Sequence, residues 1–145
     1  MTKNVNATKE HSSKSIHGTF NHLLAADKIW LSRFRDEPVL DGFMGPGIRS
    51  LDQELHSNFD ELRGERARID AELEGWASEL TEDRLMAPFA YRRGGRRQTE
   101  PLWWAVAHVF NHQTHHRGQI TTLLSQTGHD PGVTDLVAML REEVA

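Results

Sequence analysis

The sequence of 145 residues contains no cysteine. This absence excludes disulfide bonds, catalysis by a protein thiolate and metal sites that depend on sulfur ligands. Long apolar runs are missing too, because no segment approaches the roughly 20 apolar residues that a membrane-spanning helix needs. Any metal ion that the protein binds must therefore be held by nitrogen and oxygen atoms.

The chain also lacks an excess of basic residues. Its 17 Lys and Arg residues stand against 21 Asp and Glu residues, and the formal net charge is −4. That charge gives no general attraction to nucleic acid or to an anionic membrane. The basic run from Arg92 to Arg97 is a local exception, but no aromatic residues interleave with it, so we expect no nucleic-acid partner.

Length and composition indicate one globular domain, with 37% hydrophobic and 26% charged residues. The first 14 residues are polar and lack the apolar core of a signal peptide. We therefore expect a cytoplasmic protein that has no membrane partner. Its expected organisation is a polar N-terminal arm over residues 1–14, followed by one helical domain over residues 15–145.

Apolar residues recur with helical spacing in three long segments. Between residues 15 and 34 they fall on two opposite sides of the helical wheel, which predicts a helix buried between neighbours. From Leu51 to about Leu80 a single apolar stripe runs through a charged segment and predicts a helix with one buried face. A third long helix is predicted from Thr99, which would be its N-terminal cap, to about Thr127.

Segments rich in glycine and proline separate these helices. Residues 35–50 and 85–98 are expected to be loops. The second of them allows a pair of short strands that face each other across Gly94 and Gly95. A short C-terminal helix is expected after Thr134, which would cap it. The apolar residues of this last helix are Leu136, Val137, Met139 and Leu140.

Four of the nine histidines lie within nine residues of the third long helix. Three of them, His108, His112 and His116, recur at intervals of four and therefore stack on one face of a helix. On the helical wheel His112 and His116 fall inside the apolar arc, whereas His108 and His115 lie at its edge. The imidazoles of His112 and His116 therefore point toward the interior, where a polar group without a partner costs about 1–3 kcal/mol.

Two explanations account for these inward-facing imidazoles. Each is a core histidine bonded to a carbonyl or carboxylate, or the two bind one metal ion together with a third histidine. His22 is the best third candidate, because Ala25 and Ala26 share its side of the first helix and leave room for an ion. Three imidazoles leave coordination positions open, as in reactive metal sites, and all-nitrogen ligation suits Zn²⁺, Ni²⁺ or Fe²⁺.

The segments around these histidines resemble the DinB/YfiT-like family of metal-dependent proteins. The resemblance rests on HVFNHQTHHRGQ and LLSQTGHDPGVTDL near the C-terminus and on HGTFNHLLAADKIWLSRF upstream. It covers most of the chain and implies an all-α, up-down-down-up four-helix bundle that often forms a homodimer. It also implies a divalent metal ion bound by three histidines, which here are His22, His112 and His116.

The resemblance implies further roles. His108, Asn111 and His115 fall at positions that pack around the ligands or support them. Arg117 and Gln119 either pack between helices or face a substrate. Some members of the wider superfamily transfer a thiol such as bacillithiol, mycothiol or glutathione to a small electrophile. The resemblance therefore suggests either a metal-dependent thiol S-transferase or a stress-response protein that binds metal without catalysis.

The sequence departs from the family pattern at its start. Members usually have an additional helix before the segment that begins here near His17, and a polar lead stands in its place. We therefore expect a shortened bundle that lacks the usual first helix. Either the start of the chain has been placed too late, or this is a shortened variant whose exposed groove is filled by the partner in a homodimer.

Overall fold

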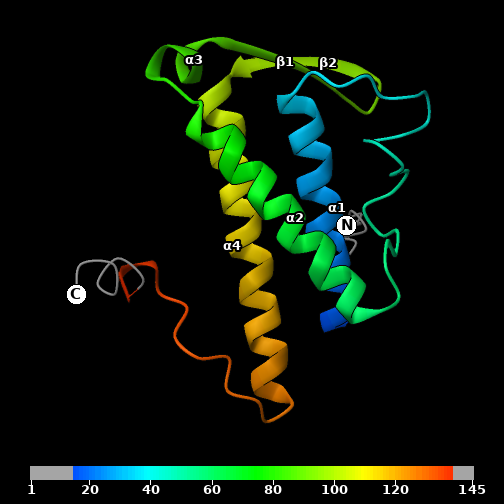
Figure 1. Cartoon of the computed structure of the whole chain (residues 1–145), viewed down its shortest axis with the longest axis vertical. Helices are drawn as coiled ribbons and strands as arrows, with labels where there is room; N and C mark the ends of the chain where they lie inside the picture. Colours follow the sequence, from blue (N-terminus) through cyan, green and yellow to red (C-terminus); the bar gives the residue numbers. More distant parts are fainter. Residues whose placement is uncertain (1–14, 139–145) are drawn as a thin grey trace, which may run out of the picture.

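The computed structural model describes residues 15–138, in which three long helices pack side by side (Figure 1). The elements are α1 (Ile16–Phe34), α2 (Phe59–Ser78), α3 (Glu82–Met86), β1 (Pro88–Arg93), β2 (Arg96–Pro101) and α4 (Leu102–Gln126). The helices α1 and α2 run in the same direction and α4 runs in the opposite one, while α3 and the two strands lie across one end (Figure 1). No helix among the described residues is long and apolar enough to cross a bilayer.

Helix α1 is buried on two opposite sides, as its sequence predicts. Ser15 caps its start, where the side-chain oxygen accepts a hydrogen bond from the Gly18 amide at 3.0 Å. One side of α1 packs into the main core with α2 and α4, and the other side packs against a loop that buries Ile48. The main core consists of Leu24, Trp30, Leu31, Phe34, Leu62, Ile69, Trp76, Tyr91, Leu102, Ala105 and Val109.

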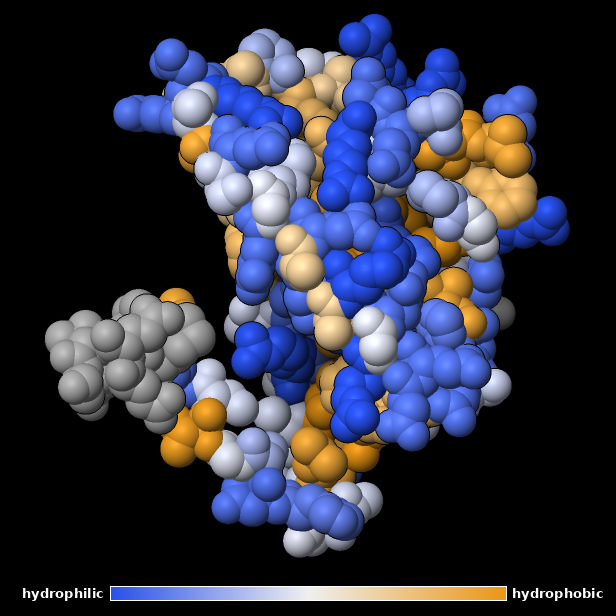
Figure 2. Space-filling model, viewed as in Figure 1, coloured by the Kyte–Doolittle hydropathy of each residue, from blue (hydrophilic) through white to orange (hydrophobic). Residues whose placement is uncertain are grey.

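Helix α2 begins at Phe59, so the prediction of a start at Leu51 is wrong. Leu51 and Leu55 are half-buried because they pack from the preceding loop against α1, not because they lie on a helix. Asn58 caps α2 by accepting hydrogen bonds from two amides of its first turn at 2.8 and 3.1 Å. The face that α2 turns to solvent is hydrophilic (Figure 2), in agreement with a single apolar stripe.

The strands β1 and β2 form an antiparallel hairpin, so the pair of short strands that the sequence allows is present. Gly94 and Gly95 form its turn with φ angles of 57° and 75°, which glycine adopts without strain. The predicted cap at Thr99 is wrong, because Thr99 is paired within β2 and α4 begins at Leu102. Residues 99–101, which resemble a helix start, are instead paired with β1.

Helix α4 ends at Gln126, next to the predicted end. Gly128 follows with a φ of 80°, and its amide donates to the Ser125 carbonyl at 3.1 Å. The amide of His129 donates to the carbonyl of Leu124 at 3.0 Å. These two bonds form a Schellman motif, in which a glycine in the left-handed region ends the helix.

The fold is mostly helical, as predicted, and the hairpin before α4 is its one small sheet within the described residues. The directions of α1, α2 and α4 are those of the second, third and fourth helices of an up-down-down-up bundle (Figure 1). The complete four-helix bundle stays a prediction, because the described residues contain three of its long helices. Residues 136–138 are helical where the short C-terminal helix is predicted. Met139, Leu140 and the predicted arm over residues 1–14 lie outside the described residues.

A buried carboxylate joins the three long helices. Asp27 of α1 is 3% exposed, and its Oδ2 accepts a hydrogen bond from Arg66 of α2 at 2.6 Å. The side-chain amide of Gln113 in α4 donates to the same oxygen. Burial raises the pKa of Asp27, and the charge of Arg66 opposes that shift. Arg66 also pairs with the more exposed Asp70 at 2.5 Å, so its guanidinium bridges the interior and the surface.

Replacing Asp27 with Asn should lower the free energy of unfolding by about 2–4 kcal/mol, because a partly buried Arg66 loses its inner counter-charge. Asp70→Asn is the matched control, since it removes the outer partner of the same guanidinium and should cost less than about 1 kcal/mol. Urea denaturation of the three proteins measures both changes. Equal losses in the two variants would contradict the role assigned to Asp27.

Candidate metal centre

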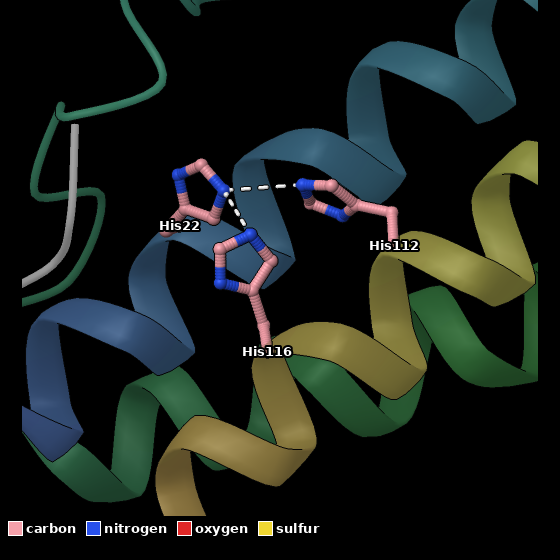
Figure 3. Close-up of side chains that lie close together, drawn as sticks. All are labelled: His22, His112 and His116. Atoms are coloured by element: carbon pink, nitrogen blue, oxygen red, sulfur yellow. Dashed lines mark hydrogen bonds between the residues drawn. The ribbon is translucent and has the colours of Figure 1, made fainter. Parts of the chain in front are cut away.

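Three histidines from two helices converge on one point. His22 of α1 and His112 and His116 of α4 turn their Nε2 atoms toward one another (Figure 3). The Nε2 of His22 lies 3.2 Å from that of His112 and 3.1 Å from that of His116. His22 and His116 are buried, and His112 is half-buried. These three residues, called the His triad below, are the ones that the sequence analysis selects as metal ligands.

The spacing of the triad suits a shared metal ion. Ligands at the usual metal–nitrogen distance of about 2.0–2.1 Å lie roughly 2.9–3.4 Å apart in octahedral or tetrahedral geometry. The separations of 3.1 and 3.2 Å fall inside that range. In residues 15–138 the cluster has three members, all of them imidazoles. Such a donor set leaves at least one coordination position for water or a substrate.

Hydrogen bonds at the opposite ring nitrogens orient two of the imidazoles. The Nδ1 of His22 donates to the Leu51 carbonyl at 3.1 Å, and the Nδ1 of His116 donates to Oε1 of Gln119 at 2.7 Å. Because both partners only accept, each neutral ring carries its hydrogen on Nδ1 and presents a lone pair at Nε2. Two lone pairs 3.1 Å apart repel each other unless a cation or proton lies between them, so the arrangement fits a metal site.

A buried asparagine, which the sequence analysis missed, holds the loop beside the triad. The Oδ1 of Asn21 accepts hydrogen bonds from the amides of Leu55 and His56 at 2.8 and 3.0 Å. Its Nδ2 donates to the carbonyls of His17 and His56 at 3.2 and 3.1 Å. This side chain fixes the loop whose carbonyl orients His22. The signal in the sequence is an asparagine within a helix that is buried on two sides, where its amide needs partners.

Burial favours the neutral form of two of the three rings, those of His112 and His116. Burial first, and then the charges that the surrounding histidines would carry, lower the pKa of His112 to about 4. Burial also lowers the pKa of His116, although its hydrogen bond to Gln119 acts in the opposite direction. An imidazole has to be neutral at the coordinating nitrogen, so these shifts favour metal binding at pH 7.

The other residues that the sequence analysis selects lie around the triad. His108 is one turn away on α4 and packs against aromatic rings. His115 is exposed, and its Nε2 lies 3.3 Å from the amide nitrogen of Gln119. Gln119 therefore links this surface histidine to the ring of His116 and helps to position that ring. This role differs from both of the roles predicted for Gln119, which are packing between helices and facing a substrate. Asn111 and Arg117 are exposed.

The metal-free protein should lose stability as the pH falls from 7 toward 4. The unfolded chain binds a proton at His112 near pH 6.5, whereas the folded chain binds it near pH 4, so the unfolded state takes up more protons in this window. The variant His112→Gln should therefore show a weaker pH dependence. Urea denaturation at pH 7 and pH 5 measures it, with the exposed His129→Gln as control. The same loss of unfolding free energy between pH 7 and pH 5 in all three proteins would contradict the lowered pKa of His112.

The sequence was compared with models of known protein families, with curated proteins and with solved structures. The family model described as "DinB family" matches residues 3–143. That range contains α1, α2, α4 and the hairpin, together with all three histidines of the triad. No curated protein and no solved structure matches the sequence. Because the family model covers nearly the whole length, the chain belongs to the DinB family.

Proposed function

We propose that the His triad binds a divalent metal ion and that the protein is a metal-dependent transferase, which joins a low-molecular-weight thiol to a small electrophile. The observation that carries the proposal is the convergence of three imidazole Nε2 atoms, with that of His22 at 3.2 and 3.1 Å from those of His112 and His116. A site with three protein ligands leaves room for an exchangeable one. The candidate thiols are bacillithiol, mycothiol and glutathione, and the candidate ions are Zn²⁺, Ni²⁺ and Fe²⁺.

A divalent ion in this site would lower the pKa of a bound thiol and orient its sulfur for attack. The protein keeps the Nε2 lone pairs of His22 and His116 directed inward, because Leu51 and Gln119 hold the hydrogens on Nδ1. In the reaction a carbon–sulfur bond forms while the bond between carbon and the leaving group breaks. The leaving group departs with its electron pair, and the thiol proton is released to solvent.

Purified protein should contain a divalent ion and consume thiol and electrophile in equal amounts. His112→Gln and His116→Gln should each reduce metal affinity and turnover by about tenfold or more, because each removes one of three ligands. His115→Gln is the matched control, since it alters an exposed neighbour on the same helix and should retain the metal.

Elemental analysis and a thiol-consumption assay with 1-chloro-2,4-dinitrobenzene measure these effects. The assay is run with each of the three thiols on metal-loaded protein. A rate that the triad substitutions leave unchanged would refute the transferase, and so would the absence of turnover with every thiol.

A second candidate is a metal-binding stress-response protein without catalysis. It is favoured by the placement of the triad, because His22 and His112 are 90 residues apart and one ion would connect α1 to α4. A ligand that binds only the folded state stabilises it. If this candidate is correct, removing the metal with a chelator lowers the Tm sharply while the assay above detects no turnover.

We also propose that the protein is a homodimer. Trp103 and Phe110 lie two helical turns apart on one face of α4, and they are 46% and 66% exposed. The segment beyond α4 also exposes hydrophobic side chains (Figure 2), including Val133, Leu136 and Val137. Several large apolar side chains exposed in this way are typical of protein–protein interfaces.

The substitution Phe110→Glu should convert the dimer to a monomer, because it places a charge within the apolar face of α4. Leu40→Glu is the control, since Leu40 is a 76% exposed loop residue outside that face and its substitution should leave the dimer intact. Sedimentation equilibrium of the three proteins measures the change. A monomeric wild type, or a dimer that survives Phe110→Glu, would contradict the proposed interface.

A further inference from the structure

A row of rings continues from the His triad along α4. The centroid of the His108 ring lies 6.2 Å from that of His112, and the centroid of Trp104 lies a further 6.1 Å along the helix. The planes of Trp104 and His108 are 5° from parallel. From α1, Trp30 packs beside them with its ring centroid 5.2 Å from that of His108. A row of rings, exposed at Trp104 and buried at Trp30, therefore connects the triad to the hairpin end of the helices.

A guanidinium group stands at the far end of this row. The Cζ of Arg33 lies 4.8 Å from the centre of the Trp30 ring and 5.2 Å from that of Tyr91. Arg33 is half-buried, and burial lowers its pKa because it removes water from the charge. Within residues 15–138 this guanidinium forms no ion pair with a carboxylate. A cation that is partly removed from water and lacks a counter-ion favours the binding of an anion.

A second positive charge lies beside it. Arg93 is on the same face of β1 as Tyr91, since alternate residues of a strand share a face. The charge of Arg93 adds to the effect of burial in lowering the pKa of His108, and it also lowers the pKa of Arg33, where Tyr91 acts in the opposite direction. The carboxylate in this region, Glu100, accepts a hydrogen bond from the Tyr91 hydroxyl at 2.7 Å. The two guanidinium groups of Arg33 and Arg93 therefore share this region with a single carboxylate, that of Glu100, which already accepts a hydrogen bond from Tyr91.

We propose that this cluster, called the Arg33 subsite, binds a carboxylate of the thiol whose sulfur reacts at the His triad. The inference rests on the proposed function. The path from the Arg33 guanidinium to His112 runs over the rings of Trp30 and His108, with successive separations of 4.8, 5.2 and 6.2 Å. The ligand is therefore a thiol whose carboxylate is many bonds from its sulfur, as in a peptide thiol. The aromatic row contacts the connecting atoms. The subsite consists of Trp30, Arg33, Tyr91, Arg93, Trp104 and His108.

S-methylglutathione tests the subsite separately from the chemistry, because it keeps the carboxylates of a peptide thiol and has no free thiol. Its Kd for metal-loaded protein, measured by calorimetry, should rise about tenfold in Arg33→Met and severalfold in Arg93→Met. Arg92→Met is the matched control, since it removes the same charge from the opposite face of β1 and should change the Kd less than about twofold. Arg33→Lys keeps the charge without the planar fork and should restore part of the affinity.

Metal content and the circular dichroism spectrum should be the same in all four variants. Glutathione should bind the wild type about tenfold more tightly than its diethyl ester, and Arg33→Met should abolish the difference. If the wild type does not bind S-methylglutathione, or Arg33→Met binds it equally well, the subsite is wrong. If binding depends on Arg33 but no thiol is consumed, the transferase proposal fails and the subsite stands.

Discussion

The bundle depends on a carboxylate placed where three helices meet. Asp27 is buried in α1, and its charge is tolerated there because Arg66 and Gln113 reach it from α2 and α4. Gln113 directly follows His112, so its contact with Oδ2 of Asp27 also constrains the rotation and the axial position of α4 against α1. The geometry of the His triad therefore depends on a polar contact that is not part of the triad.

The loop between α1 and α2 constrains the opposite side of α1. Gly45 approaches the helix so closely that a Cβ there would lie 2.9 Å from Cγ1 of Ile29, and Ile48 fills the adjacent space. Asn21 then fixes the end of the loop through both of its amide atoms. Two parallel helices need a long crossing segment between them. In this chain that segment also supplies the carbonyl that orients His22.

The triad can be predicted from the sequence because two local signals coincide. His112 and His116 are four residues apart within an apolar arc, and His22 lies beside small residues on an inward-facing side of its own helix. The residues that orient them carry no comparable pattern. Gln119 and the Leu51 carbonyl act through contacts that depend on side-chain direction and on the path of a loop, and helical periodicity contains neither.

The helix boundaries also divide into those that local bonds determine and those that distant contacts determine. Ser15 and Gly128 act through bonds to their own helices, and the sequence locates both ends correctly. The start of α2 is misplaced because Leu55 has the spacing of a helix while its backbone amide is bonded to Asn21. Thr99 has the chemistry of a cap, but pairing with β1 determines its conformation. Local signals are reliable where no distant strand or side chain competes for the same backbone groups.

The distribution of the triad between two helices has a kinetic consequence. His112 and His116 remain neighbours whenever α4 is helical, whereas His22 is 90 and 94 residues away in sequence and joins them only in the closed bundle. Separation of α1 from α4 would leave a two-point chelate. An ion held by all three rings would lose its third ligand whenever α1 separates from α4, so this collective motion would favour its release.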